Sequence, residues 1–452
     1  MSHSSSPFLR RRRTRRQVVG GLAGGAAAFT AGSMLPGTLL ARKAPAVIQA
    51  SGPLTYWGGL IFSDAANEML TDTINQWGSD NGVETEVVMI NQNETNQRVS
   101  AAVEAGTMPR ALDMGLDLAL LLSTSGQLQD VSDIYDTIGA AQGGWHESVD
   151  GAVAPEKFNG IRAGVPFGAG GNVLFRRQDI LDEIGVTEAP ATWQELSDVA
   201  AQAQEGAPGV YGLGLALSNV GDANLMVSAL QSYGGRIADD EGVTCTISSP
   251  ETMEFLEWVN AAWEAGLFPP GATTWDGAGD NTAYLSGQAV FIANTGSVSI
   301  AAQTDDPELF EATAYSALPA GPVMQVAPIG PNLRAIPTST EDVETVKALI
   351  EFLAQPEFLG EYYKVAIYGP VLQGQDEMEA FASTPVLGGL RDLVLNGTPP
   401  GAPDVSNTAY ADFNSNFTVP KMIQRIVVDG MSLEEAMAEA QSSGETIYAK
   451  YV

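Results

Sequence analysis

From residue 51 onward, the chain alternates segments patterned as β-strands with segments patterned as amphipathic helices. Residues 54–57 form a short β-like run that a glycine pair at 58–59 ends. A helical apolar face follows over 68–77 and ends at Gly78, and residues 83–90 return to a nearly continuous apolar run. Such a run is typical of a parallel strand buried on both faces. This order predicts an α/β fold in which crossover helices connect parallel strands.

Helix starts are also marked later in the chain. A Ser or Thr is followed three residues later by Glu, which is the spacing of a capping box, at Thr192 and Glu195, Thr338 and Glu341, and Ser432 and Glu435. Ser249 before Pro250 predicts the start of a helix that continues over 253–265. Trp258 and Trp263 have helical spacing among apolar neighbours in that segment, so we expect both in the core.

Basic and acidic residues are unevenly distributed. The 452 residues include 22 Lys and Arg and 54 Asp and Glu, for a net charge of −32. The first 50 residues hold 8 of the basic residues and no acidic ones, so residues 51–452 hold 14 basic and 54 acidic residues, a net charge of −40. Nucleic-acid binders need a basic surface, and this balance excludes that class of partner.

The residue types that build metal and cofactor sites are scarce. The chain has two histidines and one cysteine, Cys245, which excludes a disulfide framework, a Cys-rich zinc site and a multi-histidine metal site. The glycine-rich segment 164–171 lacks the third spaced glycine of a dinucleotide-binding loop and leads into a strand-like run. We therefore expect neither a cofactor nor a metal.

The N-terminal segment has the pattern of an export signal. Six arginines lie within 10–16, and an uncharged stretch rich in Gly and Ala follows over 17–41. Arg15-Arg16 before Gln17 and two valines resembles the twin-arginine motif, so we expect residues 1–50 to be a signal peptide handled by the twin-arginine export machinery. Small residues permit cleavage after Ala46 or Ala50, which would leave the mature protein in the periplasm or outside the cell. A basic N-terminus on a cytosolic protein would leave the apolar stretch unexplained.

Several short motifs follow one another along the rest of the chain. They lie at 105–109, 128–131, 165–167, 175–177, 192–196, 284–291, 318–322 and 430–436. The most specific are Val165-Pro166-Phe167 and the Thr192-Trp193 helix start. In this order the motifs resemble the extracellular solute-binding proteins, the large family that includes maltose-binding protein and serves ATP-binding-cassette (ABC) importers.

The resemblance implies a two-lobed periplasmic-binding-protein fold with hinge crossovers and a ligand cleft between the lobes. We expect crossings near 163–167, 317–330 and 368–373. Lobe 1 would comprise 51–165 plus 320–369, and lobe 2 would comprise 166–319 plus 370–452. The implied function is that of a monomeric, non-enzymatic protein that captures a sugar or oligosaccharide and delivers it to the permease subunits of an ABC importer.

A sugar site needs aromatic faces and fixed polar groups, because sugars present hydroxyls and apolar C–H faces. Candidates are residues of these types at strand ends, at crossings and in loops: Trp57, Gly58, Asp117, Phe167, Asn172, Asn219, Asp222, Trp275, Asp276, Asn294, Thr295 and Phe417. Trp57 is a candidate because we expect it at the end of the first strand. Trp275 is a candidate because it lies in a Gly/Thr-rich loop. Alternatively, Trp57 is a core aromatic and Asp117 a solvated loop carboxylate.

One alternative remains for the charge of the ligand and one for the activity of the protein. The small number of basic residues after residue 50 favours a neutral ligand, although Arg162 or Arg334 could still bind an anion. An exported glycoside hydrolase with paired carboxylates is the competing function, but no motif among the 54 acidic residues identifies a pair.

Overall fold

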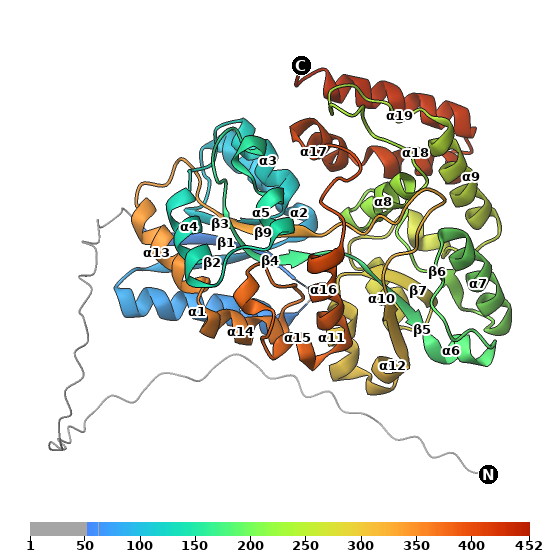
Figure 1. The fold of residues 1–452 in the computed structure, drawn as a ribbon, viewed down its shortest axis with the longest axis horizontal. Helices are drawn as coiled ribbons and strands as arrows, with labels where there is room; N and C mark the ends of the chain where they lie inside the picture. The colour runs from blue at the N-terminus through green and yellow to red at the C-terminus, as the bar shows by residue number, and fades with distance from the viewer. Residues whose placement is uncertain (1–51, 62) are drawn as a thin grey trace, which may run out of the picture. The chain divides into compact units, whose positions relative to one another are not determined.

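Two separate β-sheets organise the chain in the computed structural model, which describes residues 52–61 and 63–452 (Figure 1). The export signal predicted over 1–50 lies outside the described residues. Among the described helices, none is long and apolar enough to cross a membrane.

The first sheet has five strands and contains the predicted β-α-β unit. Its order is β2 (Thr85–Asn91), β1 (Leu54–Leu60), β3 (Ala111–Met114), β9 (Gly330–Ala335) and β4 (Val165–Gly170). β1 is parallel to β2 and β3, whereas β9 is antiparallel to both β3 and β4. The predicted crossover arrangement is therefore confirmed here, because α1 connects β1 to β2 and α2 connects β2 to β3.

Two glycine-based boundaries in this unit were predicted wrongly. β1 continues through Trp57 and Gly58 to Leu60, because its parallel pairing with β2 extends to the pair Leu60 and Asn91. The lack of a side chain at Gly58 lets Met89 of β2 pack closely, since a Cβ would lie 2.6 Å from its sulfur. Helix α1 continues past Gly78 and ends at Gly82, whose φ of 68° is the left-handed conformation that glycine favours.

The second sheet has four strands. Its order is β6 (Tyr211–Leu213), β7 (Ala289–Asn294), β5 (Val173–Arg177) and β8 (Thr313–Ser316). β6 is parallel to β7, and β5 is antiparallel to β7 and β8. The expectation of an α/β architecture is thus met by two mixed sheets.

Helices surround both sheets. In chain order they are α1 (Asp64–Asn81), α2 (Gln92–Ala105), α3 (Leu116–Thr124), α4 (Ser132–Ala141), α5 (Glu147–Ala152), α6 (Gln178–Glu183), α7 (Trp193–Gly206), α8 (Leu225–Ser232), α9 (Pro250–Glu264), α10 (Gly279–Leu285), α11 (Ser297–Asp305), α12 (Pro307–Ala312), α13 (Val343–Leu353), α14 (Pro356–Val365), α15 (Ala380–Ser383), α16 (Pro385–Asn396), α17 (Thr408–Ser415), α18 (Thr418–Val427) and α19 (Leu433–Tyr448). Short 3-10 turns are η1 (Pro155–Lys157), η2 (Gly221–Asn224), η3 (Pro270–Thr273) and η4 (Gln373–Gln375).

Three of the four predicted helix starts are confirmed. The side chains of Thr192, Ser249 and Ser432 each cap their helix by accepting a backbone N–H. The start predicted at Thr338 is wrong, because α13 begins only after Asp342 and the Thr338 hydroxyl instead bonds the Gly126 carbonyl. The core role of Trp258 is also confirmed: the ring is buried, and its N–H bonds residues of α7.

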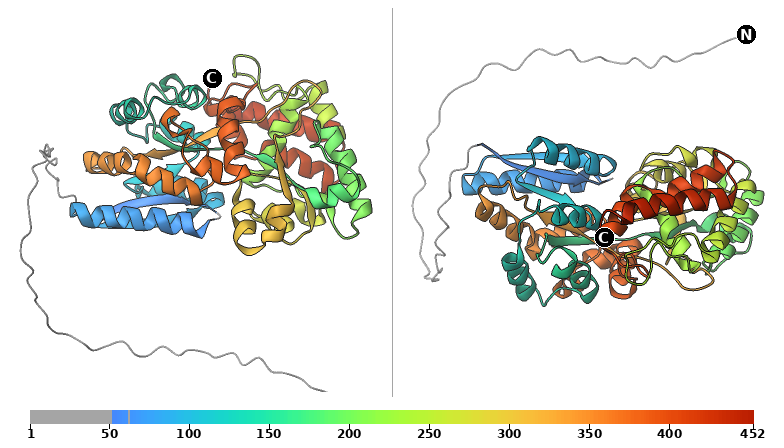
Figure 2. Two further views of the ribbon diagram at one scale, coloured as in Figure 1. Left: turned by 60° about the horizontal axis from the view of Figure 1, so that its bottom comes forward. Right: turned by 90° about the horizontal axis from the view of Figure 1, so that it is seen from above.

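The chain passes between the two sheets three times. The first passage follows β4, and the second precedes β9. The third follows α14, where Gly369 pairs with Ala169 of β4. Helix α16 lies between the sheets and packs on β4 of one and on β5 and β8 of the other (Figures 1 and 2). These passages lie near the predicted crossings, while the lobe limits 51–165 plus 320–369 and 166–319 plus 370–452 stay a prediction.

Candidate functional site

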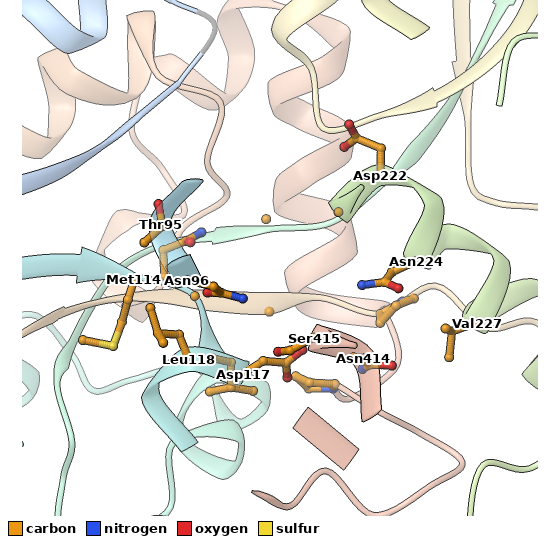
Figure 3. A pocket seen from close by; sticks show the side chains of 18 of the residues that line it. Thr95, Asn96, Met114, Asp117, Leu118, Asp222, Asn224, Val227, Asn414 and Ser415 are labelled. Carbon is orange, nitrogen blue, oxygen red and sulfur yellow. The ribbon is translucent and has the colours of Figure 1, made fainter. Parts of the chain in front are cut away.

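A cavity of about 730 Å³ lies between elements of the two sheets (Figure 3). Its lining from the first sheet includes the end of β3, the first turn of α3, the start of α2 and part of β4. The opposite lining comes from η2, α8 and α17. The volume lies within the range of about 300–1,000 Å³ that is usual for small-molecule sites.

Half of the residues predicted to contact ligand line this cavity. They are Asp117, Phe167, Asn172, Asn219, Asp222 and Phe417. These residues are spread over three hundred positions of sequence, and the chain passages between the two sheets bring them together.

The other half lie outside the cavity lining, beginning with Trp57 and Gly58. Both belong to the middle of β1 rather than to its end, so the reason for choosing Trp57 was wrong. Trp57 is half-buried and packs against the apolar cluster that includes Leu112 and Leu118. Gly58 is buried. Trp57 therefore has the role of a packing aromatic in this structure.

Trp275 and Asp276 hold their own loop together. The Trp275 ring packs directly on Gly279, where a Cβ would clash with the ring. The backbone carbonyl of Trp275 accepts a 2.7 Å hydrogen bond from the Ser218 hydroxyl. The Asp276 carboxylate accepts from the Ala278 N–H. Only Gly277, between them and Ala278, lines the cavity.

Asn294 is the last residue of β7 and Thr295 follows it, and neither is part of the cavity lining. The Asn294 amide donates to Asp280 and Asn281, and its oxygen accepts from the Gly296 N–H and the Ser297 hydroxyl. All of its hydrogen-bonding groups are thus used inside the protein. Ligand contact by the six residues outside the lining stays a prediction that this geometry does not favour.

A buried arginine supports the floor of the cavity. Arg334 on β9 is 1% exposed, lies 3.5 Å from the Asp113 carboxylate and donates to the Tyr56 hydroxyl at 3.0 Å. Its guanidinium lies 4.2 Å from the centre of the Phe167 ring. Burial raises the pKa of Asp113 to about 6, against the opposing charge of Arg334. Asp113 and Phe167 line the cavity, whereas Arg334 does not.

Neither arginine considered for an anionic ligand is available for one. Arg334 is held behind the floor, and Arg162 pairs with Asp150 at 2.7 Å. Among the described residues that line the cavity, none is Lys or Arg. The acidic residues of the lining are Asp113, Asp117 and Asp222.

Asp117 and Asp222 have raised pKa values for different reasons. Burial raises the pKa of Asp117 to about 6, and a hydrogen bond from the Asn414 amide opposes the shift. Asp222 is exposed to the open cavity but surrounded by protein on most sides. This enclosure, followed by the charges of Asp280 and Asp276, raises its pKa to about 7.

The remaining lining consists of amides and aromatic rings. The amide side chains are Asn96, Gln97, Asn172, Asn219, Asn224, Gln231, Asn332 and Asn414. Phe167 and Tyr368 pack edge to face with ring centres 5.4 Å apart, and Tyr410 and Phe417 add rings from the C-terminal region. Amides, carboxylates and rings can bind hydroxyls and apolar C–H faces. Within the described part of the chain, no cluster of three or more His, Cys, Asp or Glu could hold a metal ion.

Sequence reasoning missed several lining residues. Asn96 and Gln97 lie just after β2, so the carboxyl end of that strand was a usable signal. Tyr410 and Asn414 lie inside α17, a helix whose contact with α3 depends on tertiary folding. Nothing in their local sequence distinguishes them from other helical residues.

Comparison with known proteins gives a consistent match. A family model described as bacterial extracellular solute-binding protein matches residues 72–388. A putative binding protein of Brucella abortus (strain 2308) is 22% identical over 232 residues, which cover 51% of this chain and 56% of the relative. The chain thus spans little more than half of that relative. A probable ABC transporter-binding protein of Deinococcus radiodurans is 22% identical over 298 residues, covering 64% and 70% of the two chains.

Solved structures match nearly the whole described fold. The maltose-bound MalE3 of T. maritima has a TM-score of 0.74 and 20% identity, covering 87% of this chain and 99% of the other. A sugar transporter from Arthrobacter chlorophenolicus A6 with bound laminaribiose has a TM-score of 0.74 and 18% identity, covering 89% and 100%. A solute-binding protein from Agrobacterium radiobacter K84 in complex with ribitol gives 0.75 and 18%, covering 88% and 100%. This likeness confirms the two-lobed fold.

Proposed function

Since this chain belongs to the bacterial extracellular solute-binding proteins, we propose that it captures a sugar or oligosaccharide in the cavity between its two lobes and delivers it to an ABC importer. The single observation that carries this proposal is the composition of the cavity lining. Amides and carboxylates from both sheets face the cavity together with four aromatic rings, and no basic side chain is among the described lining residues.

Capture requires that the ligand stabilise one arrangement of the two lobes over another. A ligand that contacts both sides of the cavity has more contacts when the lobes are closed, so it shifts the population toward the closed state. Asn172 and Phe167 would contact the ligand from the first passage between the sheets, and Asp222 and Phe417 from the opposite side. The six predicted residues in the lining are therefore the ones proposed to bind.

The proposal extends to export and to partners. Residues 1–50 would act as a twin-arginine signal peptide, and the mature protein would act as a monomer in the periplasm or outside the cell. Its partners would be the permease subunits of the importer. Family membership supports a binding protein rather than an enzyme, so the glycoside hydrolase alternative loses its support.

A thermal-shift screen of the mature chain against a sugar panel tests the proposed function. A ligand at 100 times its Kd adds about 2.7 kcal/mol of stability, enough to raise the Tm by several degrees. For the sugar that binds, we expect Asn172→Ala to weaken affinity about tenfold, because a lost hydrogen bond costs about 1 kcal/mol or more.

The matched control is Asn260→Ala, whose side chain bonds only Glu264 on the surface of α9. It should leave affinity unchanged. If no sugar raises the Tm and the protein hydrolyses a glycoside, the binding-protein proposal is wrong.

A further inference from the structure

Two carboxylates face the cavity from opposite sides without a cationic partner. Asp117 lies in the first turn of α3, beside the first sheet, and Asp222 lies in η2, beside the second. Figure 3 shows them on opposite sides of the pocket. Among the ion pairs formed by the described residues, none includes either side chain.

Among the described residues of the cavity lining, none supplies a positive charge to compensate them. The buried cation behind the floor, Arg334, is already engaged by Asp113, Tyr56 and the Leu353 carbonyl. The charges that act on Asp222 are those of the Asp280 and Asp276 carboxylates, which make its environment more negative. The cavity therefore has a net negative lining that no basic side chain balances within the described residues.

An unsatisfied acceptor lies beside Asp117. Asn414 on α17 is 9% exposed and lines the cavity, and its amide donates toward Asp117. The Oδ1 atom of Asn414 is buried and has no hydrogen-bond donor in the structure. Asp117 thus presents its carboxylate to the cavity beside a buried amide oxygen that has no donor in the structure.

Closing the lobes increases the free-energy cost of leaving these two carboxylates unpaired. Closure removes water from the cavity, and an unpaired carboxylate that loses water without gaining a partner is strongly destabilised. A ligand with a phosphate or carboxylate would add a like charge. A ligand with an ammonium group brings both the missing positive charge and several N–H donors.

From the two facing carboxylates and the unsatisfied Asn414 oxygen, we propose that the captured solute is an amino sugar, that is, a sugar carrying a protonated amine. The inference rests on the proposed function and names the ligand class for the same cavity. The amine bonds the carboxylate of Asp117 or of Asp222, while the amides bind hydroxyls and the rings of Phe167 and Phe417 contact the C–H faces.

Isothermal titration calorimetry with sugars matched in shape but not in charge tests this inference. Glucose, galactose and mannose are each compared with their 2-amino, 2-N-acetylamino and uronate forms, and cellobiose is compared with chitobiose and fully deacetylated chitobiose. In any series that binds, we expect the amine to bind at least tenfold more tightly than the parent sugar. The N-acetyl form, which lacks the charge, should lose this advantage, and the uronate should bind most weakly.

Near-isosteric variants test the assigned residues. Asp117→Asn and Asp222→Asn should each reduce the ratio of amine affinity to parent-sugar affinity several-fold. The matched control Asp72→Asn alters an exposed carboxylate on α1 outside the cavity and should leave both affinities unchanged.

The outcomes separate the two levels of the proposal. A parent or N-acetyl sugar that binds as tightly as its amine overturns the amino-sugar inference and leaves the proposed function intact. An amine preference that persists in both Asp→Asn variants overturns the role of these carboxylates. If no sugar binds here or in the thermal-shift screen and the protein hydrolyses a glycoside, the proposed function itself is wrong.

Discussion

Phe417 combines an unfavourable backbone conformation with a place in the cavity. Its φ of 53° and ψ of 43° are left-handed, which is rare for a bulky residue. It precedes α18 without a side-chain cap, and its ring lines the cavity. Strained residues of this kind are enriched at ligand sites, where the surrounding structure over-determines them.

A glycine and an alanine at this position separate strain from ligand contact. Both variants remove the ring, but only glycine adopts positive φ without cost, so Phe417→Gly should be more stable than Phe417→Ala by about 1 kcal/mol. Both should weaken sugar binding equally. Urea unfolding measures the first difference and calorimetry the second. Equal stability of the two variants would show that the backbone there is not strained.

Trp275 illustrates how the composition of a loop can have a packing explanation. An aromatic ring in a Gly-rich loop suggested a ligand platform. The structure explains the glycines differently: Gly279 is present because the Trp275 ring needs the space that a Cβ would occupy. Packing of the indole therefore accounts for Gly279, and ligand contact by Trp275 stays a prediction.

At the scale of elements, the cavity-facing ends of β3, α3 and η2 each carry a carboxylate with a raised pKa. Asp113 faces Tyr56 and Arg334, Asp117 faces Asn414 and Tyr410, and Asp222 faces Asp276 and Asp280. The pKa values of these three carboxyls are about 6, 6 and 7, above the usual value for Asp.

These shifts predict how the stability of the ligand-free protein depends on pH. Between about pH 4 and 7 the folded state binds more protons than the unfolded state at these carboxyls, so their contribution to stability rises as the pH falls. It is lost as the pH rises through the folded pKa values near 6 and 7. We expect a higher Tm at pH 5.5 than at pH 8.

Variants distinguish this effect from general surface charge. Asp117→Asn and Asp222→Asn should each reduce the Tm difference between the two pH values, while Asp72→Asn, which removes a surface charge, should preserve it. A Tm that falls on acidification, or a pH slope that neither cavity variant changes, would contradict the prediction. Differential scanning calorimetry without ligand provides the measurement.

Helix caps show what local sequence can decide at this scale. Ser432 and Glu435 form a full capping box because both partners lie within one turn and need nothing from the rest of the chain. Thr338 and Glu341 have the same spacing, but Thr338 hydrogen-bonds Gly126, a residue distant in sequence. A tertiary contact there overrides the local signal.

At the scale of the whole molecule, the dominant feature is the charge of residues 51–452, which is −40. Repulsion among so many like charges opposes compact structure. Salt screens it, since the Debye length falls from roughly 10 Å at 0.1 M to 3 Å at 1 M. We expect the Tm of the mature protein to rise by several degrees over this range of NaCl.

A second salt separates screening from specific ion effects. NaBr at equal ionic strength should give a similar rise if screening is the cause. A Tm that stays flat or falls with NaCl would mean that the acidic surface does not limit stability.

The sequence alone determined the features that depend on neighbours along the chain. Strand and helix periodicity predicted the α/β class, three caps predicted helix starts, and the ordered motifs predicted the two-lobed fold. Polar and aromatic residues near strand ends and crossings predicted five of the cavity residues, and the family resemblance predicted Phe417. These signals are local because backbone hydrogen bonding and side-chain capping act over a few residues.

Only the tertiary structure decided which side chains share the cavity. Parallel pairing with β2 extended β1 past Trp57 and removed that residue from a strand end. Packing of α17 on α3 brought Asn414 to Asp117, and pairing of β9 with β3 and β4 placed Arg334 behind the floor. The physical reason is that charge, burial and unsatisfied hydrogen bonds depend on neighbours in space, and here such neighbours lie hundreds of residues apart in sequence.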